Sequence, residues 1–134
     1  VAWNYRMPNL NAALGCAQLE QLPRFVAAKR VLADRYRAAF QNMAGMRVLS
    51  EPKGTQSNYW LVTLLVDKGG DDWLGSTLPA LHEAGFLCRP AWTALHQLPM
   101  FKECPKSSLA MTENLAGCII SLPSSVKLGL PFLA

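Results

Sequence analysis

A near-continuous apolar run is the feature that most restricts how this chain can fold: Tyr59-Trp60-Leu61-Val62-Thr63-Leu64-Leu65-Val66. The run is rich in β-branched and aromatic residues, which are enriched in strands. Uninterrupted apolar runs of this length are typical of strands that are buried on both faces. We therefore expect a central strand over about residues 58–66, preceded by a turn at Pro52-Lys53-Gly54.

The residues before this run show helical periodicity. Pro8 suits a first helical turn, and Asn9 or Asn11 could cap it, so the sequence predicts a helix over about 9–22. Its buried face would carry Leu10, Leu14 and Ala17.

Pro23 is expected to break or kink this helical pattern. A second helix, over about 24–43, would end before Gly45 and would bury apolar residues at three, four and seven residue spacings: Phe25, Leu32, Tyr36, Ala39 and Met43. Its opposite side is basic and is expected to be a solvated face, formed by Lys29, Arg30, Arg35 and Arg37.

Short strand and helix signals alternate after Gly45. Strands are expected over about 46–49, 86–89 and 118–121. Gly75 and Pro79 should limit the regular part of the helix that ends at Gly85, so that it begins near Thr77. Ser107 or Ser108 would cap a further helix that extends to about 116, and the tail from Leu122 is expected to be loop.

These elements predict a single α+β domain over residues 1–134. Helices packed on a small mixed or antiparallel sheet would form an α/β sandwich. The chain has 134 residues and is 51% hydrophobic, which is enough for a core of its own.

Composition excludes several classes of function. The net charge of +4 comes from scattered basic residues, whereas nucleic-acid binding requires a basic stripe with interleaved aromatics. No apolar run is long enough to span a membrane and no signal peptide is evident, so we expect a cytoplasmic protein without nucleic-acid or membrane partners. The four cysteines form no Cys-x-x-Cys pair, so no metal site is expected, and they are best explained as reduced and mostly buried, with disulfides as the alternative: Cys16, Cys88, Cys104 and Cys118.

A polar cluster at the start of the chain is the strongest candidate for ligand chemistry. Asn4, Tyr5 and Arg6 offer an amide, a phenol and a guanidinium, a set suited to phosphate or carboxylate oxygens. Without further information, Asn4 would more often be a turn or cap residue. The helix that follows is rich in small side chains, which allow a partner to approach closely.

Several motifs resemble the DegT/DnrJ/EryC1/StrS family of sugar aminotransferases, and most closely its legionaminic-acid-type branch. They cover nearly the whole chain: Asn4-Tyr5-Arg6-Met7 with the helix start at 9–15 and Gln18-Leu19, Arg89-Pro90-Ala91-Trp92, Leu95-His96-Gln97-Leu98-Pro99-Met100-Phe101, and Leu122-Pro123-Ser124-Ser125. The resemblance implies an enzyme that uses pyridoxal phosphate (PLP) to make amino sugars for cell-surface polysaccharides. It matches the C-terminal small domain of such fold-type-I enzymes, so the large PLP-binding domain is expected to be absent here.

The resemblance also implies roles for individual residues. Asn4 would reach the cofactor phosphate of a neighbouring subunit, and Tyr5 and Arg6 would line the nucleotide-sugar cleft. His96 is implied to contact the substrate without a catalytic role. Arg89 could pair with a substrate phosphate or could equally be an exposed charge at the end of the sheet.

Transamination needs a lysine for the Schiff base and an acid that holds the pyridinium nitrogen. Neither can be placed in this chain, so no catalytic residue is predicted, and the chain alone is expected neither to catalyse nor to bind PLP. Two hypotheses follow. The chain is the C-terminal domain of a nucleotide-sugar aminotransferase, which would form homo-oligomers, or it is a stand-alone interaction or structural domain that kept the fold and lost the chemistry.

Overall fold

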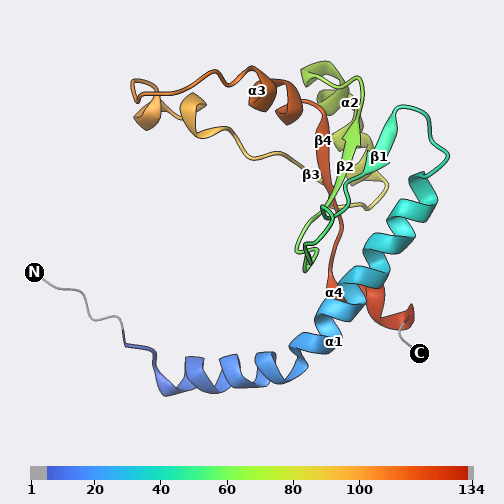
Figure 1. The fold of residues 1–134 in the computed structure, drawn as a ribbon, viewed down its shortest axis with the longest axis vertical. Coiled ribbons are helices and arrows are strands. Elements are labelled where there is room, and N and C mark those ends of the chain that lie inside the picture. Colours follow the sequence, from blue (N-terminus) through green and yellow to red (C-terminus); the bar gives the residue numbers. More distant parts are fainter. Residues whose placement is uncertain (1–5, 133–134) are drawn as a thin grey trace, which may run out of the picture.

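The computed structural model describes residues 6–132. Its elements, in chain order, are α1 (Asn9–Phe40), β1 (Met46–Val48), β2 (Val62–Val66), α2 (Asp71–Glu83), β3 (Arg89–Pro90), α3 (Ala110–Ala116), β4 (Ile119–Leu122) and α4 (Val126–Gly129). Three short 3-10 turns accompany them: η1 (Leu95–Gln97), η2 (Pro99–Phe101) and η3 (Leu130–Phe132). Figure 1 shows two arms that project from a small central sheet: the first half of α1 and the segment that carries η1 and η2.

The four strands form one antiparallel sheet in the order β1-β2-β4-β3. The predicted α+β fold with a small sheet is therefore confirmed, and β2 is an inner strand as expected. The strand begins at Val62 rather than near residue 58, because Tyr59 adopts a positive φ of 46° and Trp60 is 64% exposed. The strand expected over 86–89 is reduced to Arg89–Pro90, an edge position where a proline is tolerated.

One face of the sheet holds the core. Val62, Leu64 and Ile120 alternate along β2 and β4 and are buried under α1 and α2. Ala33, Tyr36 and Phe40 of α1 pack against them, as do four apolar residues of α2: Trp73, Leu74, Leu78 and Leu81. The second half of α1 therefore holds the sheet from one side.

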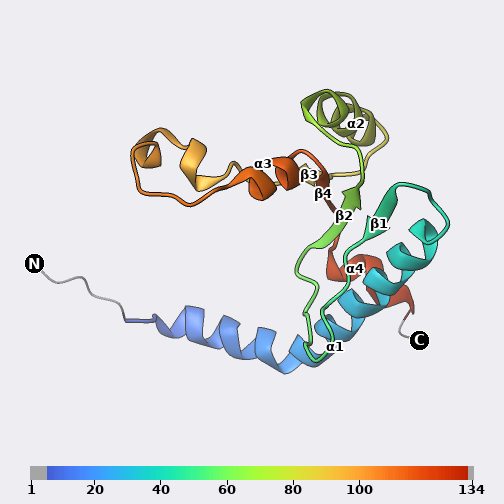
Figure 2. The ribbon, with the colours of Figure 1, turned by 45° about the horizontal axis from the view of Figure 1, so that its top comes forward.

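The predicted pair of helices is a single helix, α1, with Pro23 inside it. Figures 1 and 2 both show α1 changing direction along its length, as expected where a proline removes a backbone hydrogen bond. The buried residues of α1 all lie after Pro23, at Ala28, Leu32 and Ala33. The expectation of a buried face at Leu10, Leu14 and Ala17 is wrong for this chain, because Leu10 is 80% and Leu14 is 63% exposed, and Ala17 is also exposed.

The tail after Leu122 is not simply loop, because α4 packs against α1. The contact is close: a Cβ added to Gly129 would lie 2.0 Å from the carbonyl oxygen of Ala28. A glycine at this position therefore lets the two backbones touch.

Several local predictions were also wrong. Helix α2 runs through Gly75 and Pro79, which both lie on its exposed side, where water can satisfy the freed carbonyl. Asp71 and Asp72 favour its start through the helix dipole. The predicted side-chain caps are not used, since Pro8 and Leu109 occupy the N-cap positions of α1 and α3.

The four cysteine thiols are free. Cys88 and Cys118 are buried as expected, whereas Cys16 and Cys104 are exposed. Within residues 6–132, no helix is both long and apolar enough to cross a membrane.

Candidate functional site

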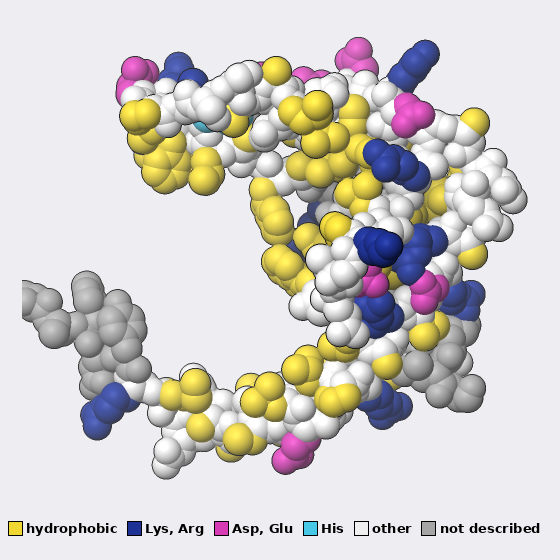
Figure 3. Space-filling model, in the orientation of Figure 1, with side chains coloured by type: hydrophobic (Ala, Val, Ile, Leu, Met, Phe, Trp, Pro, Cys, Tyr) yellow, Lys and Arg dark blue, Asp and Glu magenta, His cyan; other side chains and the backbone are white. Residues whose placement is uncertain are grey.

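The face of the sheet that α1 and α2 leave uncovered carries a hollow of about 530 Å³. Leu61 and Thr63 of the β2 segment contribute to it, and Arg89 and Ser121 are directly paired across β3 and β4. Because side chains alternate along a strand, these residues point away from the buried side chains of Val62 and Ile120. Figure 3 shows hydrophobic side chains gathered on the inner side of the bend between the two arms.

Two tryptophans stand at this hollow. The rings of Trp60 and Trp92 have centroids 6.0 Å apart and are tilted by 31°. Trp60 is 64% and Trp92 is 74% exposed. Aromatic surface of this size is normally buried or used for contact with a partner or ligand, so the pair marks a contact surface.

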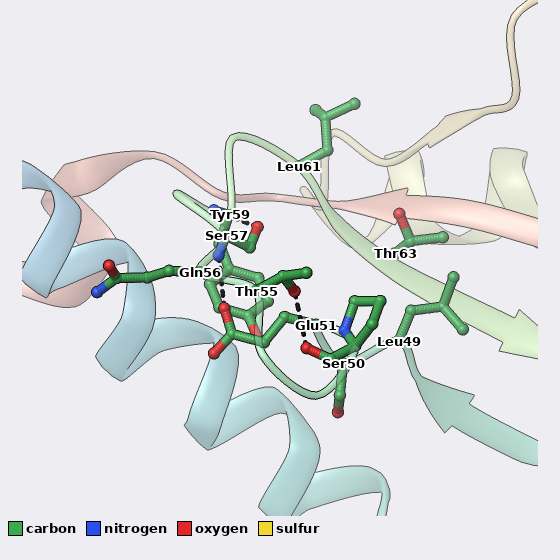
Figure 4. A pocket seen from close by; sticks show the side chains of 10 residues that line it. Leu49, Ser50, Glu51, Thr55, Gln56, Ser57, Tyr59, Leu61 and Thr63 are labelled. Carbon is green, nitrogen blue, oxygen red and sulfur yellow. Dashed lines mark hydrogen bonds between the residues drawn. The ribbon is translucent and has the colours of Figure 1, made fainter.

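The loop before Trp60 is fixed to α1 by a polar cluster. Arg30 donates to both carboxylate oxygens of Glu51, at 3.0 and 2.5 Å, and to the carbonyl of Ser57 at 2.7 Å. The carboxylate of Glu51 also accepts from the backbone N–H of Ser57. Figure 4 shows how Glu51 and Ser57 face each other inside the loop.

Tyr59 completes this cluster. The guanidinium carbons of Arg30 and Arg37 lie 5.5 and 5.4 Å from the centroid of its ring, and Arg37 donates to its hydroxyl at 3.0 Å. Cation–π contacts and the hydrogen bond together hold a residue whose φ is positive. Tyr59 is thereby fixed, and so is the direction in which the chain presents Trp60.

The electrostatics of Glu51 follow from this geometry. The hydrogen bonds from Arg30, followed by the bond from the backbone of Ser57, lower the pKa of Glu51 to about 2. The same pair raises the pKa of Arg30. Both groups are therefore charged at any pH at which the protein is expected to work.

Lys29 holds the end of the same loop, at Trp60. Its ammonium donates to the carbonyls of Trp60, at 3.3 Å, and of Ser124. The hydroxyl of Ser124 donates to the same Trp60 carbonyl at 2.8 Å. Burial lowers the pKa of Lys29.

The expectation that the basic side of this helix is a solvated face is therefore wrong for three of its four residues. Lys29, Arg30 and Arg37 are half-buried and make the contacts just described. Sequence reasoning missed these anchoring residues because the partners through which they hold the 51–60 segment and Ser124 lie 21 to 95 residues away along the chain. No local spacing carries such a signal.

His96 lies in η1, apart from the residues that line the hollow. Its Nε2 atom is 2.9 Å from a carboxylate oxygen of Glu113 in α3, and its side chain is 11% exposed. This contact ties η1 to α3.

Among the described residues, the structure does not bring the predicted site residues into one place. Arg89 lines the hollow, whereas Arg6 precedes the half of α1 that projects away from the sheet in Figures 1 and 2. Asn4 and Tyr5 lie outside the described residues.

The hollow does not fit a PLP site by itself. Its lining holds one cation, Arg89, and no lysine that could form a Schiff base. Within residues 6–132, no group of three His, Cys, Asp or Glu side chains converges to hold a metal ion.

The fold is similar to that of one part of two solved aminotransferases. The structure is similar to the aminotransferase PseC of Helicobacter pylori, which is involved in pseudaminic acid biosynthesis, with a TM-score of 0.82 and 21% identity over 98% of this chain and 36% of that chain. It is also similar to DesI, solved with its TDP-sugar product, with a TM-score of 0.80 and 23% identity over 95% of this chain and 33% of that one. The chain thus has the fold of one part of a fold-type-I aminotransferase.

Sequence comparison identifies the family. The model of the DegT/DnrJ/EryC1/StrS aminotransferase family matches residues 1–130, and the chain belongs to this PLP-dependent family. GDP-perosamine synthase of Vibrio cholerae is 34% identical over 125 residues, which are 92% of this chain and 34% of that protein. GDP-perosamine synthase of Escherichia coli O157:H7 is 32% identical over 126 residues, 92% of this chain and 33% of that protein. The chain spans about a third of the length of these relatives.

Proposed function

We propose that this chain is the C-terminal small domain of a PLP-dependent nucleotide-sugar aminotransferase. In the complete enzyme it supplies contacts to the cofactor phosphate through Asn4, contacts to the substrate through Tyr5, Arg6, Arg89 and His96, and part of a dimer interface. The enzyme acts in the cytoplasm, on activated sugars destined for cell-surface polysaccharides. The family match over residues 1–130, set against relatives about three times as long, is the observation that carries this proposal.

The first half of α1 supports a role inside a larger assembly. Four of its leucines are 47% to 80% exposed: Leu10, Leu14, Leu19 and Leu22. Apolar surface of this extent on a helix marks contact with another part of an assembly. In the complete enzyme we expect this arm to pack against the large domains, and in the isolated chain we expect it to drive self-association.

For the substrate, we propose a nucleotide sugar of the legionaminic-acid type. The Asn4-Tyr5-Arg6-Met7 motif with the helix start that follows it favours this branch, whereas two of the relatives described above are GDP-perosamine synthases. Assaying a panel of keto-sugar nucleotides with the chimera described below distinguishes these substrates.

The alternative is a stand-alone domain that binds partners without chemistry. One observation favours it: within the described residues, no buried side-chain nitrogen or oxygen lacks a hydrogen-bond partner. Such a chain could fold without a large domain.

A chimeric enzyme distinguishes the C-terminal domain of an aminotransferase from the stand-alone domain. This chain replaces the matching third of the Vibrio cholerae relative, and retained PLP and amino transfer to the relative's own substrate are measured. We expect both to be restored. A chimera that folds as a dimer and retains neither would overturn the proposal and favour the stand-alone domain.

Two substitutions in that chimera test individual contacts. Asn4→Ala should weaken retention of PLP, and Arg6→Ala should mainly raise the KM for the nucleotide sugar. An unchanged cofactor affinity in the Asn4→Ala variant would mean that Asn4 only precedes the helix as a turn residue.

A further inference from the structure

Pro23 stands at a boundary within α1. Residues 6–24 are all exposed, apart from Ala12 and Gly15, which are partly exposed. All the buried residues of the helix come after Pro23. Neither hydrophobic cluster of the described chain contains a residue from 9–22. The first half of α1 therefore packs on none of the core residues that hold the sheet.

The second half of α1 is fixed to the sheet from several directions. Lys29 and Arg30 donate hydrogen bonds to backbone carbonyls of the 57–60 segment. Helix α4 packs against the same half, where Gly129 lies close to the backbone of Ala28. The second half and the sheet are therefore held together as one body.

Pro23 interrupts the hydrogen bonding of α1 at this boundary. A proline has no N–H, so the carbonyl of Leu19, four residues earlier, loses its helical partner, and the ring crowds that carbonyl. Leu19 and residues 20–24 are all exposed, so water can satisfy the carbonyl and no packing braces the bend. Figures 1 and 2 show that α1 changes direction along its length. A helix bends most easily where a backbone hydrogen bond is missing.

We propose that α1 is hinged at Pro23, so that residues 9–22 swing as one helical unit relative to the body formed by the sheet and the second half of the helix. The hinge does not rest on the proposed function, because every contact in the argument lies within this chain. It gives the exposed leucines of the first half a range of directions. A partner that packs on these leucines then fixes the direction of the arm.

The native cysteines allow the swing to be measured as a distance. Cys16 is an exposed thiol on the first half of α1, and Glu83→Cys places a second thiol at the exposed end of α2, on the body. Cys104→Ser removes the other exposed thiol, while Cys88 and Cys118 are buried. Spin labels on the two exposed thiols report their distance distribution by pulsed electron paramagnetic resonance. Dilution with unlabelled chain restricts the signal to pairs within one molecule.

The hinge predicts a broad distribution in the chain that carries Pro23. About 10 Å of helix separates Cys16 from Pro23, so a swing of roughly 40° displaces the label by about 7 Å. Pro23→Ala and Pro23→Gln both restore the missing N–H, so both should narrow the distribution and shift its mean. Arg24→Ala changes the neighbouring exposed residue without altering the backbone hydrogen bonds and should leave the distribution unchanged.

Three results would overturn the hinge. A narrow distribution in the chain with Pro23 would mean that the bend is rigid. A distribution that stays equally broad in Pro23→Ala and Pro23→Gln would mean that the first half moves for a reason other than the proline. An equal narrowing in Arg24→Ala would remove the specific role of Pro23. Activity of the chimera bears only on the proposed function, since the hinge is measured in this chain alone.

Discussion

The two halves of α1, residues 9–22 and 24–40, have similar helical sequence patterns and opposite surroundings. The second half buries Ala28, Leu32 and Ala33 and holds the sheet, the 50–60 loop and α4. The leucines of the first half are exposed, and Figure 1 shows this half projecting away from the sheet. An apolar helical pattern therefore does not by itself say whether its surface packs within the same chain.

The largest expected effect on stability comes from comparing Gly129, which packs against the second half of α1, with Gly15, which lies in the first half. Gly129→Ala places a Cβ 2.0 Å from the carbonyl of Ala28, so α4 must move, and we expect a loss of about 3 kcal/mol in the free energy of unfolding. Gly15→Ala meets no atom within 4 Å and should stabilise the helix by about 1 kcal/mol. Urea denaturation of both variants measures the difference, and equal effects would remove the distinction between the halves.

The polar contacts of the second half provide the next test. Arg30→Ala removes three hydrogen bonds to Glu51 and Ser57 and should lower the Tm and expose the 50–57 loop to proteases. Arg24→Ala, an exposed position on the same helix, should change neither. If the loop were equally protected in Arg30→Ala, the cluster around Tyr59 would not be what holds it.

The same cluster predicts a pH dependence. The pKa of Glu51 is lowered from its ordinary value of 4.5 to about 2, so its charge stabilises the fold fully above pH 4.5. This contribution is lost as the pH falls through about 2, because the carboxylate becomes protonated in the folded state as well. The stability advantage over a Glu51→Gln variant should therefore shrink between these values.

Denaturation midpoints of the two proteins, measured at steps of pH, test this dependence. The difference should be constant near neutral pH. An advantage that persists unchanged at pH 2, or that has already vanished at pH 4.5, would contradict the assignment of the lowered pKa to the contacts of Arg30 and Ser57.

Part of the fold could be predicted from sequence because its signals are local. The composition of the run that contains β2 predicts a strand, and Gly45 and Gly85 mark the ends of helical segments, with positive φ at both. The start of β2 was missed because Tyr59 is turned by contacts with Arg30 and Arg37, which lie on a distant helix.

The candidate site was less predictable because its contacts also join residues that are distant along the chain. Arg89 could be singled out because it belongs to a motif, and the structure places it in a hollow. The neighbouring Trp60 could not be linked to Trp92 from spacing, since they follow or precede strands that are far apart in the sequence and are joined only through β4. The contact of His96 with Glu113, 17 residues away, also has no signal in the local sequence.

The smallest expected change in stability is in the first half of α1. Replacing Leu10 and Leu14 by Gln keeps residues of similar helix propensity and removes exposed apolar surface. Each substitution should alter the free energy of unfolding by no more than about 0.5 kcal/mol. The matched control, Leu32→Ala in the second half, creates a cavity and should cost about 2 to 5 kcal/mol.

A double variant that carries both Leu10→Gln and Leu14→Gln should nevertheless change the oligomeric state. If the first half of α1 drives self-association, the unmodified chain is oligomeric and the Leu10→Gln, Leu14→Gln chain becomes monomeric at the same concentration, as measured by light scattering. An unmodified chain that stays monomeric at every accessible concentration would refute this role. A double variant as unstable as Leu32→Ala would show that these leucines support the fold of their own chain, and the two halves of α1 would then no longer differ in function.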